Sequence, residues 1–281
     1  MANPIAKDGT HYRQERYNDA IVPLMRKELN VRNEFSRDFE GSPVSGAVKV
    51  PVRATDPTIA EYDVSAGADL TQSATTYLNV PVDNHFAINE IIDGYEADAV
   101  PDNLKAQRLE AGAYALGRKL ELNAIAELEA EGTYETSTTA LTNETAYKAI
   151  KDTIITMKGL GMRTEDLVGF VSADTEALLL EDDMFANSAG TLGAELLRDG
   201  VIGKIAGVNI KPSYNLSATT EYVVFDKRYT QAIDEWKVNL GINNLGNTFI
   251  GASALQGRIV FADAVTNSDA VRIKSTATPS A

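Results

Sequence analysis

The segment Asp102–Glu131, with the sequence DNLKAQRLEAGAYALGRKLELNAIAELEAE, carries the strongest local pattern in the chain. Pro101 suits the start of a helix here and Gly132 its end. At about 1.5 Å per residue the predicted helix is about 45 Å long, which exceeds the usual helix length in a compact domain. Apolar residues recur every three or four positions on one face of this helix, namely Leu109, Ala113, Leu116, Leu120 and Ala124.

Two glycines, Gly112 and Gly117, lie inside the predicted helix. Each costs about 1 kcal/mol relative to alanine at such a position. We therefore expect another backbone element to approach the helix closely at these two residues.

Residues 43–85 have the pattern of two β-strands joined by a long connection. The strand-like stretches are AVKVPV (47–52) and TYLNVPV (76–82), and the residues between them are rich in Gly, Ala, Ser and Thr. This pattern predicts an extended β-hairpin with little apolar material near its tip. Such a hairpin is marginal by itself, so we expect another chain to cover it.

Residues 1–42 are polar with interleaved charges and are interpreted as an N-terminal arm. Apolar residues between Ile21 and Val31 have the spacing of a short amphipathic helix that Pro23 interrupts.

The rest of the chain alternates between helical and strand patterns, which predicts an α+β body. We divide this body by elements because no linker separates independently folding domains. The expected helices are 147–157 and 175–180, and the expected strands are 167–171, 208–210, 222–225, 238–245, 257–262 and 270–274.

Composition excludes several kinds of chemistry. The chain has no cysteine, so disulfides, thiolate metal sites and cysteine nucleophiles are absent. His11 and His85 are the only histidines, and neither has an obvious catalytic partner. The net charge of −14 disfavours nucleic-acid binding through a basic groove. No apolar run is long enough to span a membrane, and no secretory signal is visible.

The motif search finds no catalytic, cofactor-binding or metal-binding residues. The stretch 200–205 has the wrong spacing for a phosphate-binding loop. The acidic groups Glu129 with Glu131 and Glu181–Asp183 lack the spacing of a glycosidase pair or a cation site, and we interpret them as solvated faces. Trp236, the single tryptophan, is interpreted as a core or interface anchor.

The order of these elements resembles that of the major capsid proteins of tailed bacteriophages, which have the Hong Kong 97 type fold. The resemblance covers most of the chain and rests on pattern and order. The stretches that carry it are VRNEF (31–35), GAVKVP (46–51), YLNVPVDN (77–84), the long helix after Val100–Pro101, DLVGFVS (166–172), and IGKIAGV (202–208) ahead of Pro212 and Tyr214.

The resemblance implies a division of the chain into the parts of that fold. These would be an N-terminal arm (1–42), an extended β-hairpin loop (43–85), a peripheral domain (86–159 and 236–281) with a spine helix (102–131), and an axial domain (160–235).

The same resemblance implies a structural role without enzymatic activity or cofactors. The chain would form hexamers and pentamers that assemble in the host cytoplasm into an icosahedral shell, the virion capsid. Its partners would be itself, a separate scaffolding protein and a portal, and it would enclose double-stranded DNA without sequence-specific binding. It would have no membrane partner.

Charged residues of the hairpin would set the register between subunits through ion pairs that individually contribute little. Lys49 is the only lysine of this loop, so we do not predict Lys–Asn crosslinks. The expected contact residues are Lys49, Arg53, Asp56, Glu61 and Asp63.

Three other interpretations remain open. An encapsulin-like compartment of the same fold would enclose an enzyme instead of a genome, and particle contents would separate the two. An acidic hydrolase with a carboxylate site would be a monomer or small oligomer that forms no shell. A tail-tube protein would depend mainly on sheets, against which the long helix argues.

Overall fold

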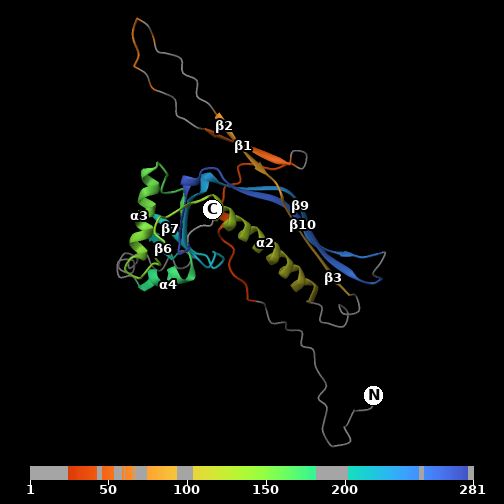
Figure 1. The fold of residues 1–281 in the computed structure, drawn as a ribbon. Coiled ribbons are helices and arrows are strands. Elements are labelled where there is room, and N and C mark those ends of the chain that lie inside the picture. Colours follow the sequence, from red (N-terminus) through yellow and green to blue (C-terminus); the bar gives the residue numbers. More distant parts are fainter. Residues whose placement is uncertain are drawn as a thin grey trace, which may run out of the picture. The chain divides into compact units, whose positions relative to one another are not determined.

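The computed structural model describes most of the chain after residue 24 (Figure 1). Contacts divide the chain into a smaller unit, made of residues 1–26, 88–114 and 239–257, and a larger unit, made of 27–87, 115–238 and 258–281. No helix in the described residues is long and apolar enough to cross a membrane. Those residues are 25–42, 46–53, 59, 61–65, 67, 75–93, 104–181, 202–246 and 250–277.

The elements follow one another in the order labelled in Figure 1. They are η1 (Arg32–Glu34), β1 (Ala47–Arg53), β2 (Thr75–Pro81), β3 (Asn84–Ile92), α2 (Leu104–Glu131), β4 (Thr133–Tyr134), α3 (Ala146–Gly159), β5 (Leu167–Val171), α4 (Ala173–Glu181), β6 (Gly203–Ile205), β7 (Val208–Pro212), β8 (Thr220–Asp226), η3 (Lys227–Tyr229), β9 (Thr230–Asn244), β10 (Ser253–Val265), η4 (Ser268–Ala270) and β11 (Val271–Ser275).

A six-stranded sheet with the order β4-β11-β8-β5-β7-β6 lies at the centre of the larger unit. Strand β5 runs antiparallel to β8 and parallel to β7, and all five of its residues are buried. Because both faces of β5 are covered, its sequence is a continuous apolar run instead of an alternating one. Gly169 fits a close approach here, since a Cβ atom would lie 2.6 Å from Cδ1 of Ile210.

Alternate residues of the central strands enter two separate cores, as the two-residue period of a strand requires. On one face, Val171 and Tyr222 pack with Ile150, Ile154 and Leu179 from α3 and α4. The other face contains a second cluster that includes α2. Its members are Val31, Phe35, Ala124, Ile125, Leu128, Val168, Phe170, Val223, Phe225, Ala232, Val265, Val271 and Ile273.

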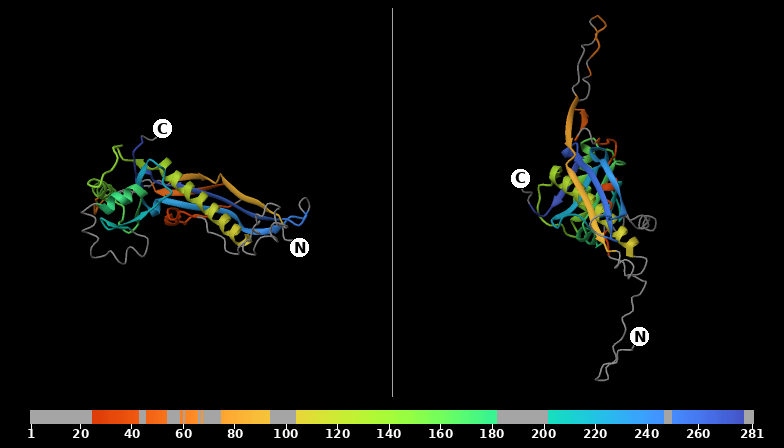
Figure 2. Two further views of the ribbon diagram at one scale, coloured as in Figure 1. Left: turned by 90° about the horizontal axis from the view of Figure 1, so that it is seen from below. Right: turned by 90° about the vertical axis from the view of Figure 1, so that its right-hand side faces the viewer.

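A second sheet has the order β3-β10-β9, and Figure 2 shows its strands in orange (β3) and blue (β9 and β10). In the larger unit, Asn123 of α2 donates a hydrogen bond to Asp263 of β10 at 3.3 Å. A third core in this unit joins Val50 and Val80 of the hairpin to Ile233 of β9 and Val260 of β10.

The long helix is confirmed over its described residues, but the reason expected for its glycines is wrong. A Cβ atom at Gly112 would meet the leucine side chains of Leu255 and Leu240 at 2.9 and 3.0 Å. At Gly117 it would meet the side chain of Leu29 at 3.0 Å. Packed leucines, and not another backbone, fill the space that these glycines leave.

The helix expected in the arm is also wrong where the structure describes it, because residues 25–30 have no regular structure and only the short turn η1 follows. The division into arm, loop, peripheral and axial domains stays a prediction. Helix α3 shares one core with β5, although the predicted boundary falls between them at residues 159 and 160.

Candidate assembly surface

The hairpin β1–β2 is held at one end by burial in the larger unit (Figure 1). The two strands pair antiparallel from Ala47 opposite Pro81 to Arg53 opposite Thr75, which confirms the predicted pairing. Val50 and Val80 are almost completely buried in the third core. This burial sets the register, because a slip of one residue would turn the buried valine of the slipped strand away from the core.

Large apolar side chains are exposed farther along the hairpin. Tyr77 of β2 is 65% exposed, and Ile59, between the two strands, is 95% exposed. Tyr62 and Val64 are also exposed. These residues are scattered among polar ones and form no strand pattern. The expectation that the tip carries little apolar material stays a prediction, since much of the tip lies outside the described residues. The exposed side chains are available for contact with another chain.

The charged residues expected to make subunit contacts have different environments. Lys49 is exposed on β1 opposite Asn79, and Arg53 ends β1. Glu61 is exposed, and neither it nor Lys49 forms an ion pair with a described residue. Asp63 is exposed, and its carboxylate accepts a hydrogen bond from the backbone N–H of Ser65 at 2.6 Å, so it stabilises a turn. The remaining expected residue, Asp56, lies outside the described residues.

Trp236 is a partly exposed residue of β9, so the expectation of a core anchor is wrong and that of an interface anchor stays a prediction. The guanidinium of Arg258 lies 5.2 Å from the centre of its ring. The same guanidinium lies 3.4 Å from Nδ1 of His85. His85 therefore belongs to a surface cluster that sequence reasoning did not find, because its members come from three strands.

The acidic groups noted in the sequence do not form a common site. Glu129 accepts hydrogen bonds from the hydroxyls of Ser217 and Thr220, each at 2.7 Å, whereas Glu131 is exposed. Glu181 is also exposed, and residues 182–183 lie outside the described residues. No group of three or more histidine, aspartate or glutamate residues that could hold a metal occurs in the described part of the chain.

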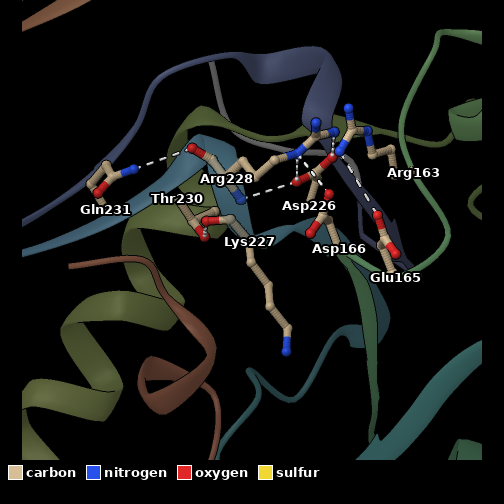
Figure 3. A network of polar contacts seen from close by, with 8 residues as sticks. All are labelled: Arg163, Glu165, Asp166, Asp226, Lys227, Arg228, Thr230 and Gln231. Carbon is tan, nitrogen blue, oxygen red and sulfur yellow. Dashed lines mark hydrogen bonds and ion pairs between the residues drawn. The ribbon is translucent and has the colours of Figure 1, made fainter. Parts of the chain in front are cut away.

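A polar network fixes the turn η3 between β8 and β9 (Figure 3). The fully buried Asp226 accepts hydrogen bonds from the backbone N–H of Arg228 at 3.0 Å and from its guanidinium at 2.6 Å. The guanidinium also pairs with Asp166 at 3.0 Å. Gln231 donates a hydrogen bond to the carbonyl of Arg228 at 3.2 Å. These bonds satisfy a buried carboxylate, which indicates a structural role.

Glu127 of α2 is a partly buried carboxyl group with a raised pKa. Burial, followed by the charges of Glu131 and Asp263, raises its pKa from 4.5 to about 7. The folded chain therefore binds more protons than the unfolded chain between these two pH values, so the free energy of unfolding falls as the pH rises through this window.

We expect Glu127→Gln to stabilise the chain at pH 8 by about 1 kcal/mol, because it removes an unfavourable partly buried charge whose full effect solvent screens. It should also flatten the pH dependence of stability between pH 4.5 and 7. Chemical unfolding at several pH values measures both effects, with the exposed Glu144→Gln as control. An unchanged pH dependence would contradict the assignment.

Comparison with solved structures identifies the fold, although no family model and no curated protein matches the sequence. One solved structure, from Mycobacterium phage Che8, has 18% sequence identity and a TM-score of 0.77 over 95% of this chain and 98% of its own. The capsid of the cyanophage P-SCSP1u has 14% identity and a TM-score of 0.72 over 93% and 92%. The mature capsid of bacteriophage PhiM1 has 15% identity and a TM-score of 0.73 over 98% and 96%.

These likenesses extend over nearly the whole of each chain and define the fold class. The chain has the capsid fold of tailed phages, the Hong Kong 97 type, which confirms the resemblance drawn from the sequence.

Proposed function

We propose that this chain is a major capsid protein, the subunit that assembles into the shell of a tailed phage head. The observation that carries the proposal is the capsid fold, shared over 95% of this chain and 98% of the compared chain. In this proposal the subunits form hexamers and pentamers around the axial domain, and the closed shell encloses double-stranded DNA in the virion. The role is structural and non-enzymatic.

The hairpin supports this proposal because one end is anchored and the other offers apolar surface. Val50 and Val80 hold the base, while Tyr77 and Ile59 remain exposed. A neighbouring copy that covers such residues gains about 25 cal/mol for each Å² of apolar surface removed from water. Repetition around a ring of subunits lets this gain exceed the cost of association. Lys49 and Glu61 would then contribute to register.

The charge of the chain supports enclosure of DNA in preference to tight binding. A net charge of −14 opposes a phosphate backbone, and confinement in a shell needs no basic groove. A separate scaffolding protein and a portal complete the proposed set of partners, and assembly takes place in the host cytoplasm.

We expect the purified chain, expressed with and without a candidate scaffolding partner, to form closed shells in negative-stain electron microscopy. The double variant Tyr77→Ser with Leu78→Ser should lose at least about nine-tenths of the shells, because both side chains lie on the exposed part of β2. Circular dichroism should show an intact fold for this variant.

The matched control is Leu122→Ser on α2, because Leu122 and Leu78 are each 38% exposed. This variant should still assemble. A monomer or small oligomer under every condition, seen by light scattering, would contradict the proposal. Protein cargo in place of nucleic acid inside the shells would favour an encapsulin-like compartment.

A further inference from the structure

The segment 27–36, here called the strap, is bound along the larger unit by hydrogen bonds to residues far away in sequence. One set of bonds joins its first half to the turn after β7, and another joins Ser36 to β9. The donors and acceptors are Lys27 Nζ to the Tyr214 carbonyl at 2.5 Å, Asn215 Nδ2 to the Glu28 carbonyl at 2.7 Å, Asn30 Nδ2 to the Pro212 carbonyl at 2.7 Å, Ser36 N–H to the Thr230 carbonyl at 3.0 Å, and Ala232 N–H to the Ser36 carbonyl at 2.8 Å.

One carboxylate on α2 binds the middle of the strap. Glu121 is only 2% exposed. Its Oε1 accepts the backbone N–H groups of Asn30 at 3.0 Å and Val31 at 2.8 Å, and its Oε2 accepts that of Arg32 at 3.0 Å. Three bonds to a charged acceptor compensate the burial of the carboxylate, because such bonds are about twice as strong as neutral ones.

The backbone of the strap suits this arrangement. Val31 has helical dihedral angles, with φ −70° and ψ −53°, and leads into η1. At the start of a helical turn, successive N–H groups point the same way and have no acceptor within the turn. The Glu121 carboxylate supplies that acceptor from a helix some 90 residues later in the chain.

Arg32 adds a second connection from the same part of the strap. Its guanidinium pairs with Asp263 at 2.8 Å and with Asp234 at 2.9 Å, and lies over the ring of Phe261. The backbone of Arg32 thus binds a carboxylate of α2, while its side chain binds carboxylates of β9 and β10.

We propose that Glu121 is a conformational latch that holds the strap against α2. A glutamine cannot replace it, because its amide group offers one acceptor oxygen and would turn N–H donors toward N–H donors. The latch acts within a single subunit, so it does not depend on the proposed capsid role.

The test compares Glu121→Gln with Glu131→Gln, an exposed substitution on the same helix. Hydrogen exchange should become roughly ten- to a hundredfold faster at the amides of Val31 and Arg32 in Glu121→Gln. Exchange at β5 should not change. The control variant should leave exchange at the strap as it is in the parent chain.

A spin label gives a second, independent measurement. Because the chain has no cysteine, Asn33→Cys creates a single labelling position on an exposed residue of the strap. The label should be immobile in the parent chain and mobile in Glu121→Gln. An immobile label with unchanged exchange would overturn the proposal, since the buried side chains of Val31 and Phe35 would then hold the strap alone.

If hydrogen exchange in Glu121→Gln became faster at β5 as well as at the strap, the role of Glu121 as a local latch would also be overturned. If Glu121→Gln does not fold, Glu121→Asp provides the second variant, because it keeps the charge but withdraws the carboxylate from the three N–H groups by one methylene. It should speed hydrogen exchange at Val31 and Arg32 while β5 stays protected. Unchanged exchange at the strap in this variant would count against the latch.

Discussion

Replacement of Arg32 by methionine is expected to lower the free energy of unfolding by about 3–5 kcal/mol. Methionine fills similar apolar volume but leaves the buried carboxylate of Asp263 without its cation. Burial already raises the pKa of Asp263 even though Arg32 opposes that rise. Denaturant unfolding followed by the fluorescence of the single tryptophan, Trp236, measures the change.

Two comparisons sharpen this prediction. Arg163 pairs with Glu165 at 3.8 Å, but the two side chains are 68% and 76% exposed, so Arg163→Met should change stability by less than about 0.5 kcal/mol. The double variant Arg32→Met with Asp263→Leu should recover most of the loss, because it removes the unpaired charge. Equal effects of Arg32→Met and Arg163→Met would contradict a buried ion pair that stabilises the fold.

Truncation of Phe225 to alanine is expected to cost about 3–5 kcal/mol. Phe225 is completely buried in β8. The centre of its ring lies 5.9 Å from that of Phe170 on the neighbouring strand, in a stacked arrangement. It lies 5.5 Å from the ring centre of Phe35 in the strap, in a T-shaped arrangement. Loss of the ring leaves a cavity that connects the sheet, the strap and α2, and none of these can close it without moving the others.

Phe225→Leu is the matched control, because it retains most of the volume and should cost less than about 1.5 kcal/mol. Tyr77→Ala removes an aromatic ring from an exposed position and should stay within about 0.5 kcal/mol of the parent chain. The same unfolding measurement serves all three variants. A loss for Phe225→Ala no larger than that for Tyr77→Ala would contradict the role given to this core.

Much of the fold could be predicted from local patterns. The apolar spacing after Pro101 predicted α2, and the apolar run at 167–171 predicted β5. Valine-rich stretches predicted the pairing of β1 with β2. These predictions succeeded because burial repeats with the period of each element, so the chain itself records which face is covered.

The candidate surface was harder to predict. Charged residues of the hairpin were predicted to make subunit contacts. The exposed apolar residues Ile59, Tyr62 and Val64 follow no period, so no pattern singled them out. The prediction of a helix in the arm failed for a related reason. Its apolar spacing predicted a helix, but Val31 and Phe35 are instead buried in a core formed with α2 and the central sheet. Burial against distant elements replaced the local helix.

By itself, the sequence determined the fold class and most of the elements that compose it, because periodic burial and the order of elements can be read along the chain. Only the tertiary structure decided which acidic residues of α2 matter. Glu121 is bonded inside the fold, Glu127 is partly buried with no cation among the described residues paired to it, and Glu131 is exposed, although all three have the same chemistry. Glu121 owes its environment to a strap about 90 residues earlier in the chain, and no local pattern records contacts over such a separation.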